Sequence, residues 1–392
     1  MNVLILEDDE IKYSQIEETL KQEIPESEII PCEHFSKFVI ESGKKKFDLI
    51  VTDLLVPLQK DAKHTTDVTN EIIDTIRDTE SPNFSTPVIA ITGFSEVATQ
   101  NYEKFNRLDI NIINYLADSD SWKEAFQLKI RNCTPPKTYR FIIFCALEKE
   151  AEAYSQLNFD IGAANCDYGI NSRTIKIHDN EGIIIVPPRM GLVHAAITCS
   201  KAISLYDPEV ICMSGICAGI NSQANIYDVI ISEMCHQHDS GKWTSDGFTP
   251  VPYAIQLQPK LQAQINQLIK SKNFYKSVKE GITLQKNEFP PDANELTFNI
   301  GISPTSSGSS VVASSEAHEE IKAQHLKEKS FDMESYALYE AARQASENLK
   351  FFSAKSVVDN GDEMKNDTFH RVASLLSAKT VFNLLSAILK NK

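Results

Sequence analysis

Short apolar blocks alternate with stretches of helical periodicity along the first third of the chain. Four blocks have the composition of buried strands: 3–7, 47–57, 87–94 and 110–116. After the first block, Ile16, Leu20 and Ile24 recur at the spacing of one helical face. Strands that are separated by helices predict a parallel sheet with helices on both faces, which is a doubly wound α/β fold.

The pattern breaks at a pair of prolines. Residues 132–137 read NCTPPK, and consecutive prolines stop a helix or strand and form a stiff, exposed joint. We therefore expect two domains, 1–131 and 139–392, joined by a linker at 132–138.

The second domain opens with a further series of apolar strands. Its predicted strands begin at 139 (YRFIIFCAL) and continue at 182–191, 210–220, 227–235 and 351–359. Amphipathic stretches at 316–349 and 366–390 predict two long helices. The serine-rich segment 303–315 is either a flexible surface loop or a loop that lines a phosphate or ribose.

Length and composition fit two cores and restrict the classes of function. The chain has 392 residues, of which 42% are hydrophobic. Acidic residues outnumber basic ones by 54 to 39, giving a formal net charge of −15, which argues against a general binder of nucleic acid or anionic membrane. No apolar run approaches the roughly 20 residues of a membrane helix, and the acidic start MNVLILEDDE has no signal-peptide pattern. The eight cysteines show no zinc spacing, so we expect buried reduced thiols and a cytoplasmic location.

Acidic and hydroxyl side chains follow the predicted strands of the first domain. These are Glu7, Asp8 and Asp9 after the first strand, Asp53 after the second and Thr92 after the third. The carboxyl ends of parallel strands meet at one edge, so these carboxylates repel each other unless a cation lies between them. A Mg²⁺ ion bound by Asp8 and Asp53 would remove the repulsion and neutralise an incoming phosphoryl group, to which Thr92 could donate a hydrogen bond. The alternative is a set of solvated acids at strand ends.

Three motifs of this domain, LEDDE, DLIVTDLLVP and PVIAIT, together resemble the receiver domains of two-component response regulators. The resemblance covers residues 1–125 and implies a receiver-like (flavodoxin-like) sheet. It also implies phosphorylation of Asp53 by a cognate histidine kinase. In such a domain Glu7, Asp8 and Asp53 hold Mg²⁺, and Thr92 is the switch hydroxyl.

Two departures from the receiver pattern affect the expected response to phosphorylation. Asp118 lies about where receiver domains carry a lysine that pairs with the phosphorylated aspartate. The stretch after Pro57, LQKDAKHTTDVT, is also longer than usual. The conformational readout can therefore differ from that of the family.

Three carboxylates of the second domain suit the cleavage of an N-glycosidic bond. This reaction passes through an oxocarbenium ion and needs an acid for the leaving purine, a carboxylate for water and a group that holds the ribose hydroxyls. Glu150 follows the strand FIIFCAL, Glu334 lies in FDME, and Asp359 ends the strand FFSAKSVVD. Each alone is more often a surface acid, but partly desolvated carboxylates can hold a raised pKa and donate a proton.

Five motifs of the second domain occur in the order CALEKEAEAY, PPRMGLVHAA, SGICAGI, FDMES and SVVDNGD. Together they resemble the nucleoside phosphorylase and nucleosidase superfamily, over residues 139–390. The resemblance implies a mixed central sheet, a homo-oligomer and a reaction without a cofactor. It places the water-activating glutamate at Glu150, the ribose-binding methionine and glutamate at Met333 and Glu334, and the purine-protonating aspartate at Asp359.

Departures from this second pattern point to a charged substrate tail. Pro188 and Arg189 stand where nucleosidases carry serine and glycine, and a methylthio tail would need an apolar pocket. The candidate phosphate-binding cations are Arg189, His194, His236, His238, Lys242 and Lys355. Ordinary surface cations are the alternative, and a metal bound by His236, His238 and Asp239 is a remoter one. The glutamate at position 150 favours hydrolysis, although Arg189 could also hold inorganic phosphate for phosphorolysis.

A receiver joined to a nucleosidase-like domain resembles the response-regulator effectors of bacterial antiphage two-component systems. That resemblance implies an adenine nucleotide substrate, with ATP split into adenine and ribose 5′-triphosphate. Three alternatives stay open: a methylthioadenosine/S-adenosylhomocysteine nucleosidase, a purine nucleoside phosphorylase and a non-catalytic nucleotide-binding regulator. No basic DNA-binding domain is expected.

Overall fold

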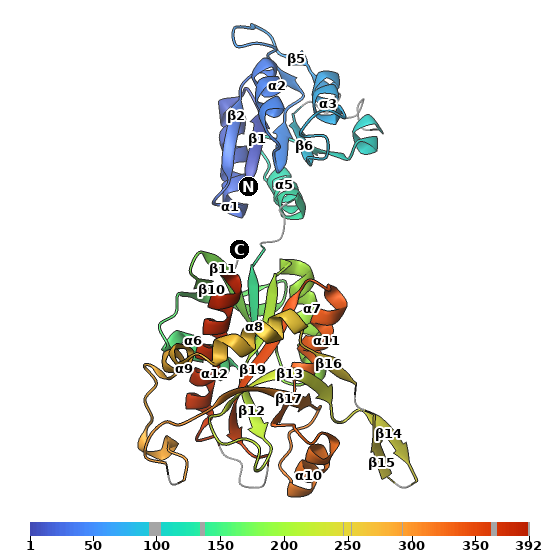
Figure 1. Ribbon diagram of the computed structural model, residues 1–392. Coiled ribbons are helices and arrows are strands. Elements are labelled where there is room, and N and C mark those ends of the chain that lie inside the picture. The colour runs from blue at the N-terminus through green and yellow to red at the C-terminus, as the bar shows by residue number, and fades with distance from the viewer. Residues whose placement is uncertain are drawn as a thin grey trace. The chain divides into compact units, whose positions relative to one another are not determined.

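In the computed structural model the chain divides into two units, Met1–Pro136 and Lys137–Lys392 (Figure 1). The structure describes residues 1–93, 103–133, 138–245, 247–251, 253–291, 293–361 and 367–390. The last helix of the first unit ends at Cys133, and residues 134–137 of the predicted linker 132–138 lie outside the described residues.

The first unit is built on a five-stranded parallel sheet with the strand order β2-β1-β3-β6-β7. The strands are β1 (Asn2–Leu6), β2 (Glu28–Cys32), β3 (Leu49–Thr52), β6 (Val88–Thr92) and β7 (Ile110–Asn114). Four of them lie in the predicted blocks. The prediction missed β2, an edge strand whose sequence EIIPC is short and interrupted by proline.

Helices cover both faces of this sheet, as the pattern predicted. They are α1 (Glu10–Glu23), α2 (Phe35–Lys44), α3 (Thr69–Arg77) and α5 (Ser121–Cys133). Ile16 of α1 and Phe126 of α5 pack in one core with Val3 and Ile5, whereas α2 and α3 pack against the opposite face. The long stretch after Pro57 lies in a small hairpin of β4 (Leu55–Val56) and β5 (Thr66–Asp67).

The second unit contains a mixed ten-stranded sheet with the order β16-β13-β17-β18-β12-β8-β11-β10-β9, in which β19 pairs with both β12 and β13. The strands are β8 (Phe141–Cys145), β9 (Ile161–Asp167), β10 (Ile170–Ile177), β11 (Asn180–Val186), β12 (Val210–Gly219), β13 (Val229–Gln237), β16 (Ala254–Gln256), β17 (Ile300–Ser307), β18 (Ser330–Asp332) and β19 (Lys350–Asp359). A separate hairpin joins β14 (Gly241–Thr244) to β15 (Gly247–Pro250). The expected mixed sheet is therefore present.

Helices of the second unit pack against this sheet. They are α6 (Glu148–Gln156), α7 (Leu192–Tyr206), α8 (Pro259–Ile269), α9 (Lys272–Lys279), α10 (Ser315–Gln324), α11 (Ser335–Ala345) and α12 (His370–Leu389), with a short 3₁₀ turn at Lys286–Glu288. By length and apolar composition α12 could cross a membrane, contrary to the sequence expectation that no run was long enough. Most of α12 is buried, and it contacts β12, β19 and α6 (Figure 1). It therefore serves as a core helix of this unit.

One sequence prediction for the second unit was wrong, and the serine-rich segment 303–315 combines a strand with a loop. The stretch 316–349 is not one helix, because β18 interrupts it between α10 and α11. There Phe331 is buried and pairs with both β12 and β17, so sheet pairing overrides the helical periodicity. The first half of the serine-rich segment, 303–307, is a buried part of β17 and not a flexible loop.

Candidate active site

One cavity of the second unit gathers the carboxylates that the sequence singled out. It encloses about 350 Å³, and Glu150, Met333, Glu334 and Asp359 all line it. They come from the start of α6, the β18–α11 junction and the end of β19. Tertiary structure thus brings together residues that are up to 209 positions apart (359 − 150).

Glu150 is buried at the first turn of α6, with its carboxylate held by backbone groups. The amide of Leu147 donates to one oxygen at 3.0 Å, and the amide of Ile216 donates to the other at 2.9 Å. Burial raises the pKa of Glu150 to about 7, against the lowering effect of Lys355. A carboxylate with this pKa is suited to take a proton from water near neutral pH.

Gly215 leaves the space that Glu150 occupies. A Cβ atom at position 215 would lie 2.3 Å from Oε1 of Glu150, and the φ angle of Gly215 is +154°. The first glycine of the SGICAGI motif is therefore required by close approach of the carboxylate to the β12 backbone.

Glu334 is held in place by a buried network of charges. It lies at the N-terminal end of α11, where one oxygen accepts from the amide of Gly191 at 3.0 Å. The other oxygen lies 3.0 Å from Nζ of Lys355, which also contacts Asp332 at 2.8 Å. Burial alone would lower the pKa of Lys355, but the two carboxylates raise it well above its usual value, so the ammonium stays charged.

The prediction of Lys355 as a phosphate-binding cation is therefore corrected. Its side chain is buried and its charge is matched by Asp332 and Glu334, so it positions Glu334 instead. Burial would raise the pKa of Asp332, but Lys355 and hydrogen bonds from serines hold it below the usual range.

The two predicted histidines on β13 are also poorly suited to phosphate. Burial lowers the pKa of His236 to about 4, so it is neutral near pH 7. Burial likewise lowers the pKa of His238, whose Nδ1 lies 2.9 Å from the Ser306 hydroxyl. A metal bound here is not supported, because no group of three His, Cys, Asp or Glu side chains in the described part of the chain is arranged to hold a metal ion.

The remaining predicted cations lie on the outside of the second unit. Arg189 is exposed in the loop that leads to Gly191, and its neighbour Met190 lines the cavity. His194 is half-buried in the first turn of α7, and Lys242 is exposed on β14.

Sequence reasoning missed several other groups at the cavity. Lys149, Asp367 and His370 line it, and Asp367 lies 3.4 Å from both Lys149 and His370. Ser310 and Val311, which belong to the serine-rich segment, line it as well; a loop that lines a ligand site was one of the two alternatives left open for that segment. Lys149 and His370 lie in the first turns of α6 and α12, and nothing in their local sequence indicates that they line a cavity.

Asp359 ends β19 with a buried carboxylate. Oδ1 accepts a hydrogen bond from the amide of Gly361 at 2.8 Å, in a turn where Gly361 has a φ of +67°. The carboxylate thus has a fixed orientation at the carboxyl end of a central strand, facing the same cavity as Glu150.

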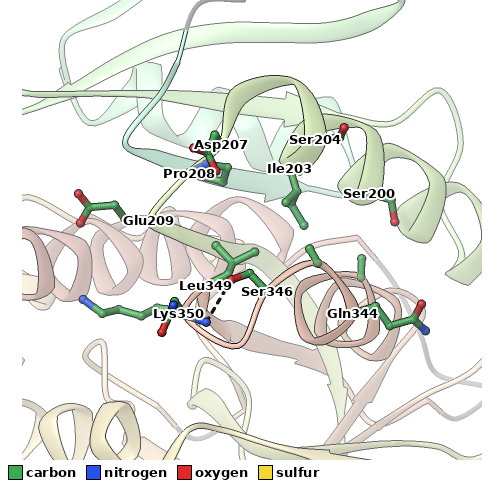
Figure 2. A pocket seen from close by; sticks show the side chains of 13 residues that line it. Ser200, Ile203, Ser204, Asp207, Pro208, Glu209, Gln344, Ser346, Leu349 and Lys350 are labelled. Atoms are coloured by element: carbon green, nitrogen blue, oxygen red, sulfur yellow. Dashed lines mark hydrogen bonds between the residues drawn. The ribbon is translucent and has the colours of Figure 1, made fainter.

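A larger cavity of about 860 Å³ lies between the C-terminal ends of α7 and α11 (Figure 2). Its charged side chains are Asp207, Glu209 and Lys350, among small polar neighbours. The residues suited to glycosidic chemistry line the smaller cavity, so we place the candidate active site there.

In the first unit, the predicted acids meet a buried lysine. Nζ of Lys12 lies 2.5 Å from Oδ2 of Asp53 and 2.7 Å from Oε2 of Glu7. Burial raises the pKa of Glu7 to about 7 and also raises that of the half-buried Asp8. As placed, these residues do not fit the predicted Mg²⁺ ion, because an ammonium already bridges two of its three expected ligands.

The other predicted groups of the first unit lie on neighbouring strands. Thr92 is buried at the end of β6, the strand next to β3. Asp118 is exposed in the turn after β7. Sequence reasoning missed Lys12, which lies on α1 four residues after Asp8.

Comparison with known proteins bears on both units. The sequence profile described as the phosphorylase superfamily matches residues 140–390. The protein y4jS of Sinorhizobium fredii is 24% identical over 96% of this chain and 97% of its own length. ATP nucleosidase Cap17 of Escherichia coli is 24% identical over 50% of this chain and 40% of that protein. A 5′-methylthioadenosine/S-adenosylhomocysteine nucleosidase of Staphylococcus aureus is 25% identical over 53% of this chain and 82% of that protein.

Solved structures share the fold of this region. A nucleosidase of the same description from Colwellia psychrerythraea, solved with adenine, has a TM-score of 0.51 at 16% identity and covers 65% of this chain and 97% of its own. One from Helicobacter pylori has a TM-score of 0.50 at 18% identity, covering 64% and 98%. At these identities the likeness concerns the fold alone.

Proposed function

Because the chain belongs to the phosphorylase superfamily through residues 140–390, we propose that it is a purine nucleosidase that hydrolyses ATP to adenine and ribose 5′-triphosphate. The convergence of Glu150, Glu334 and Asp359 on one cavity carries the proposal. The similarity to proteins named as nucleosidases, one of them an ATP nucleosidase, supports it.

Each carboxylate has a distinct task in the proposed reaction. Glu150 accepts a proton from water as the water oxygen attacks the anomeric carbon. The bond between that carbon and the purine nitrogen breaks, its electron pair goes to the base, and Asp359 donates a proton to a ring nitrogen. Glu334, fixed by Gly191 and Lys355, holds the ribose hydroxyls together with Met333. The base leaves as neutral adenine.

The choice of ATP depends on cations near the cavity. Lys149 and His370 line it, and exposed Arg189 adjoins the lining residue Met190. Such groups can bind phosphate oxygens through charge-assisted hydrogen bonds. Lys355 is paired with two carboxylates, and burial lowers the pKa of His236 and His238, so the proposal relies on Lys149, His370 and Arg189 instead.

A second candidate, a methylthioadenosine/S-adenosylhomocysteine nucleosidase, is favoured by the apolar part of the lining. Met190, Val311, Val312 and Phe331 all face the cavity. An apolar surface of this kind suits a thioether tail, and sequence reasoning did not foresee it.

We further propose that the first unit is a receiver that controls this activity. A parallel sheet of order 2-1-3-4-5, with Asp53 at the end of its third strand in chain order, supports the proposal. A cognate histidine kinase would phosphorylate Asp53, and the response would release the nucleosidase as an antiphage effector within a cytoplasmic homo-oligomer. The y4jS relative matches along both units, which supports their functional coupling.

The test is to incubate the purified full chain with ATP, deoxyATP, adenosine or methylthioadenosine and to separate free adenine by chromatography. Adenine from ATP without added phosphate is the expected result, and a requirement for phosphate would make the enzyme a phosphorylase. Adenine from methylthioadenosine alone would select the second candidate. Asp359→Asn should abolish adenine release, whereas Asp160→Asn, at an exposed position, should not. Full activity of Asp359→Asn would refute the assignment.

Control by the first unit needs its own comparison. Asp53→Ala and the wild-type chain are compared after incubation with a small phosphoryl donor, with adenine release as the readout. We expect the donor to change the activity of the wild type and to leave Asp53→Ala at its basal rate. An identical response of both proteins would contradict a role for Asp53.

A further inference from the structure

The side chain of Lys12 lies between Glu7 and Asp53, the two buried acids at the strand ends of the first unit, here called the acid pocket. Its Nζ lies 2.5 Å from Asp53 and 2.7 Å from Glu7, and all three side chains are buried. At these distances the ammonium occupies the space between the two carboxylates. No water or ion of ordinary size fits between Lys12 and either oxygen.

The backbone of α1 sets the position of this lysine. Asp9 caps the helix, and its carboxylate accepts from the amides of Ile11 and Lys12 at 2.9 Å. Side chains in the first helical turn point back toward the preceding strand end, which here carries Glu7. The ring of Tyr115, one residue beyond β7, lies 5.4 Å from Nζ and adds a cation–π contact.

Asp53 is held from both sides. Its Oδ1 accepts from the amide of Leu54 at 2.6 Å, so Oδ2 is the oxygen left for a cation, and Lys12 takes it. After β7, the residue at the position expected for a lysine is the exposed Asp118. Among the described residues, Lys12 is the cation that reaches Asp53.

We propose that Lys12 is the resident counter-cation of this pocket, which neutralises Glu7 and Asp53 and keeps a divalent cation out of the space between them. The consequence of this arrangement for signalling rests on the proposed receiver role of the first unit. Metal loading, and any modification of Asp53 that requires it, must first displace Lys12. A lysine from helix α1 thus sets a threshold for entry into the signalling state.

The test is calorimetric titration of Mg²⁺ into the full chain at constant ionic strength. Lys12→Met removes the charge and keeps the length of the side chain, and Lys21→Met, at an exposed position on the same helix, is the matched control. We expect Lys12→Met to bind Mg²⁺ at least about tenfold more tightly than the wild type, because a like charge has left the site. The control should match the wild type. Equal Mg²⁺ affinity of Lys12→Met and the wild type would overturn the proposal.

Lys12→Gln is a second variant in case Lys12→Met does not fold, because the glutamine amide can still donate hydrogen bonds to both carboxylates. Trp122, which contacts Tyr115 at a ring distance of 5.2 Å, provides a second readout in a Trp243→Phe background. The change in Trp122 fluorescence on Mg²⁺ binding should occur at lower concentration in Lys12→Gln than in the wild type, and identical titration curves would count against the proposal. The titrations need neither phosphorylation nor adenine release. Failure of the receiver proposal would therefore leave their result unchanged, and failure here would leave that proposal standing.

Discussion

Replacing Lys355 by methionine tests how much the buried charge network at the candidate active site stabilises the second unit. The substitution keeps the length of the side chain but leaves Asp332 and Glu334, at 2.8 and 3.0 Å from the lost ammonium, without their shared cation. Removing one partner of a buried ion pair costs about 3–5 kcal/mol. For a domain of this size, each kcal/mol of destabilisation lowers the melting temperature by roughly 2–4 °C, so the melting temperature of the second unit should fall by about 6 °C or more.

Differential scanning calorimetry of the full chain measures this loss, with Lys350→Met at the half-buried start of the same strand as the control. In Lys355→Met the two facing carboxylates repel each other, so the folded state raises their pKa values. A carboxyl group whose pKa is raised on folding stabilises the folded state at low pH, and this contribution is lost as pH rises. The deficit relative to the wild type should therefore shrink as pH falls from 7 toward 5.

The double variant Asp332→Asn/Lys355→Met provides the decisive comparison. It removes one of the two facing carboxylates and should recover part of the lost stability. A melting temperature of Lys355→Met within about 1 °C of the wild type would refute the reasoning, because a buried unpaired charge destabilises the folded state by more than that shift represents. So would a double variant no more stable than the single one.

Three further predictions concern activity. Burial raises the pKa of Glu150 to about 7, and the proposed role of this residue is that of the base. We therefore expect kcat/KM for adenine release to rise with pH through about 7, and Glu150→Gln to lose roughly 10²–10⁴-fold above that pH, where the wild-type carboxylate is ionised; a flat profile would contradict the assignment. Gly215→Ala should lower kcat, because the added Cβ would lie 2.3 Å from the Glu150 carboxylate. The control Gly301→Ala, where a Cβ meets nothing within 4 Å, should leave kcat unchanged. Equal rates in the two variants would show that Glu150 tolerates displacement. Arg189→Ala should raise KM for ATP about tenfold while leaving KM for methylthioadenosine unchanged, and a parallel rise for both substrates would exclude a phosphate-specific role.

The sequence went far toward the candidate active site because strand ends are visible in it. Asp359 is the last residue of an apolar strand, and Glu150 lies in the first helical turn after another. The carboxyl ends of parallel strands in one sheet lie at the same edge. The structure brings both to one cavity with Glu334. The cations were harder to assign, since charge alone does not tell whether a lysine lines an open cavity, as Lys149 does, or pairs with buried carboxylates, as Lys355 does.

The alternation of apolar blocks and helical stretches by itself determined the α/β class, the division near the paired prolines and most central strands, because these depend on local periodicity and turn chemistry. Only the tertiary structure decided that β18 interrupts the predicted helix at 316–349, since pairing of Phe331 with two strands outweighs local propensity. It also decided that Lys12 lies between Glu7 and Asp53 and that Lys355 serves Glu334. Ion pairing inside a core depends on which charges meet without water, and that is set by packing between segments far apart in the chain.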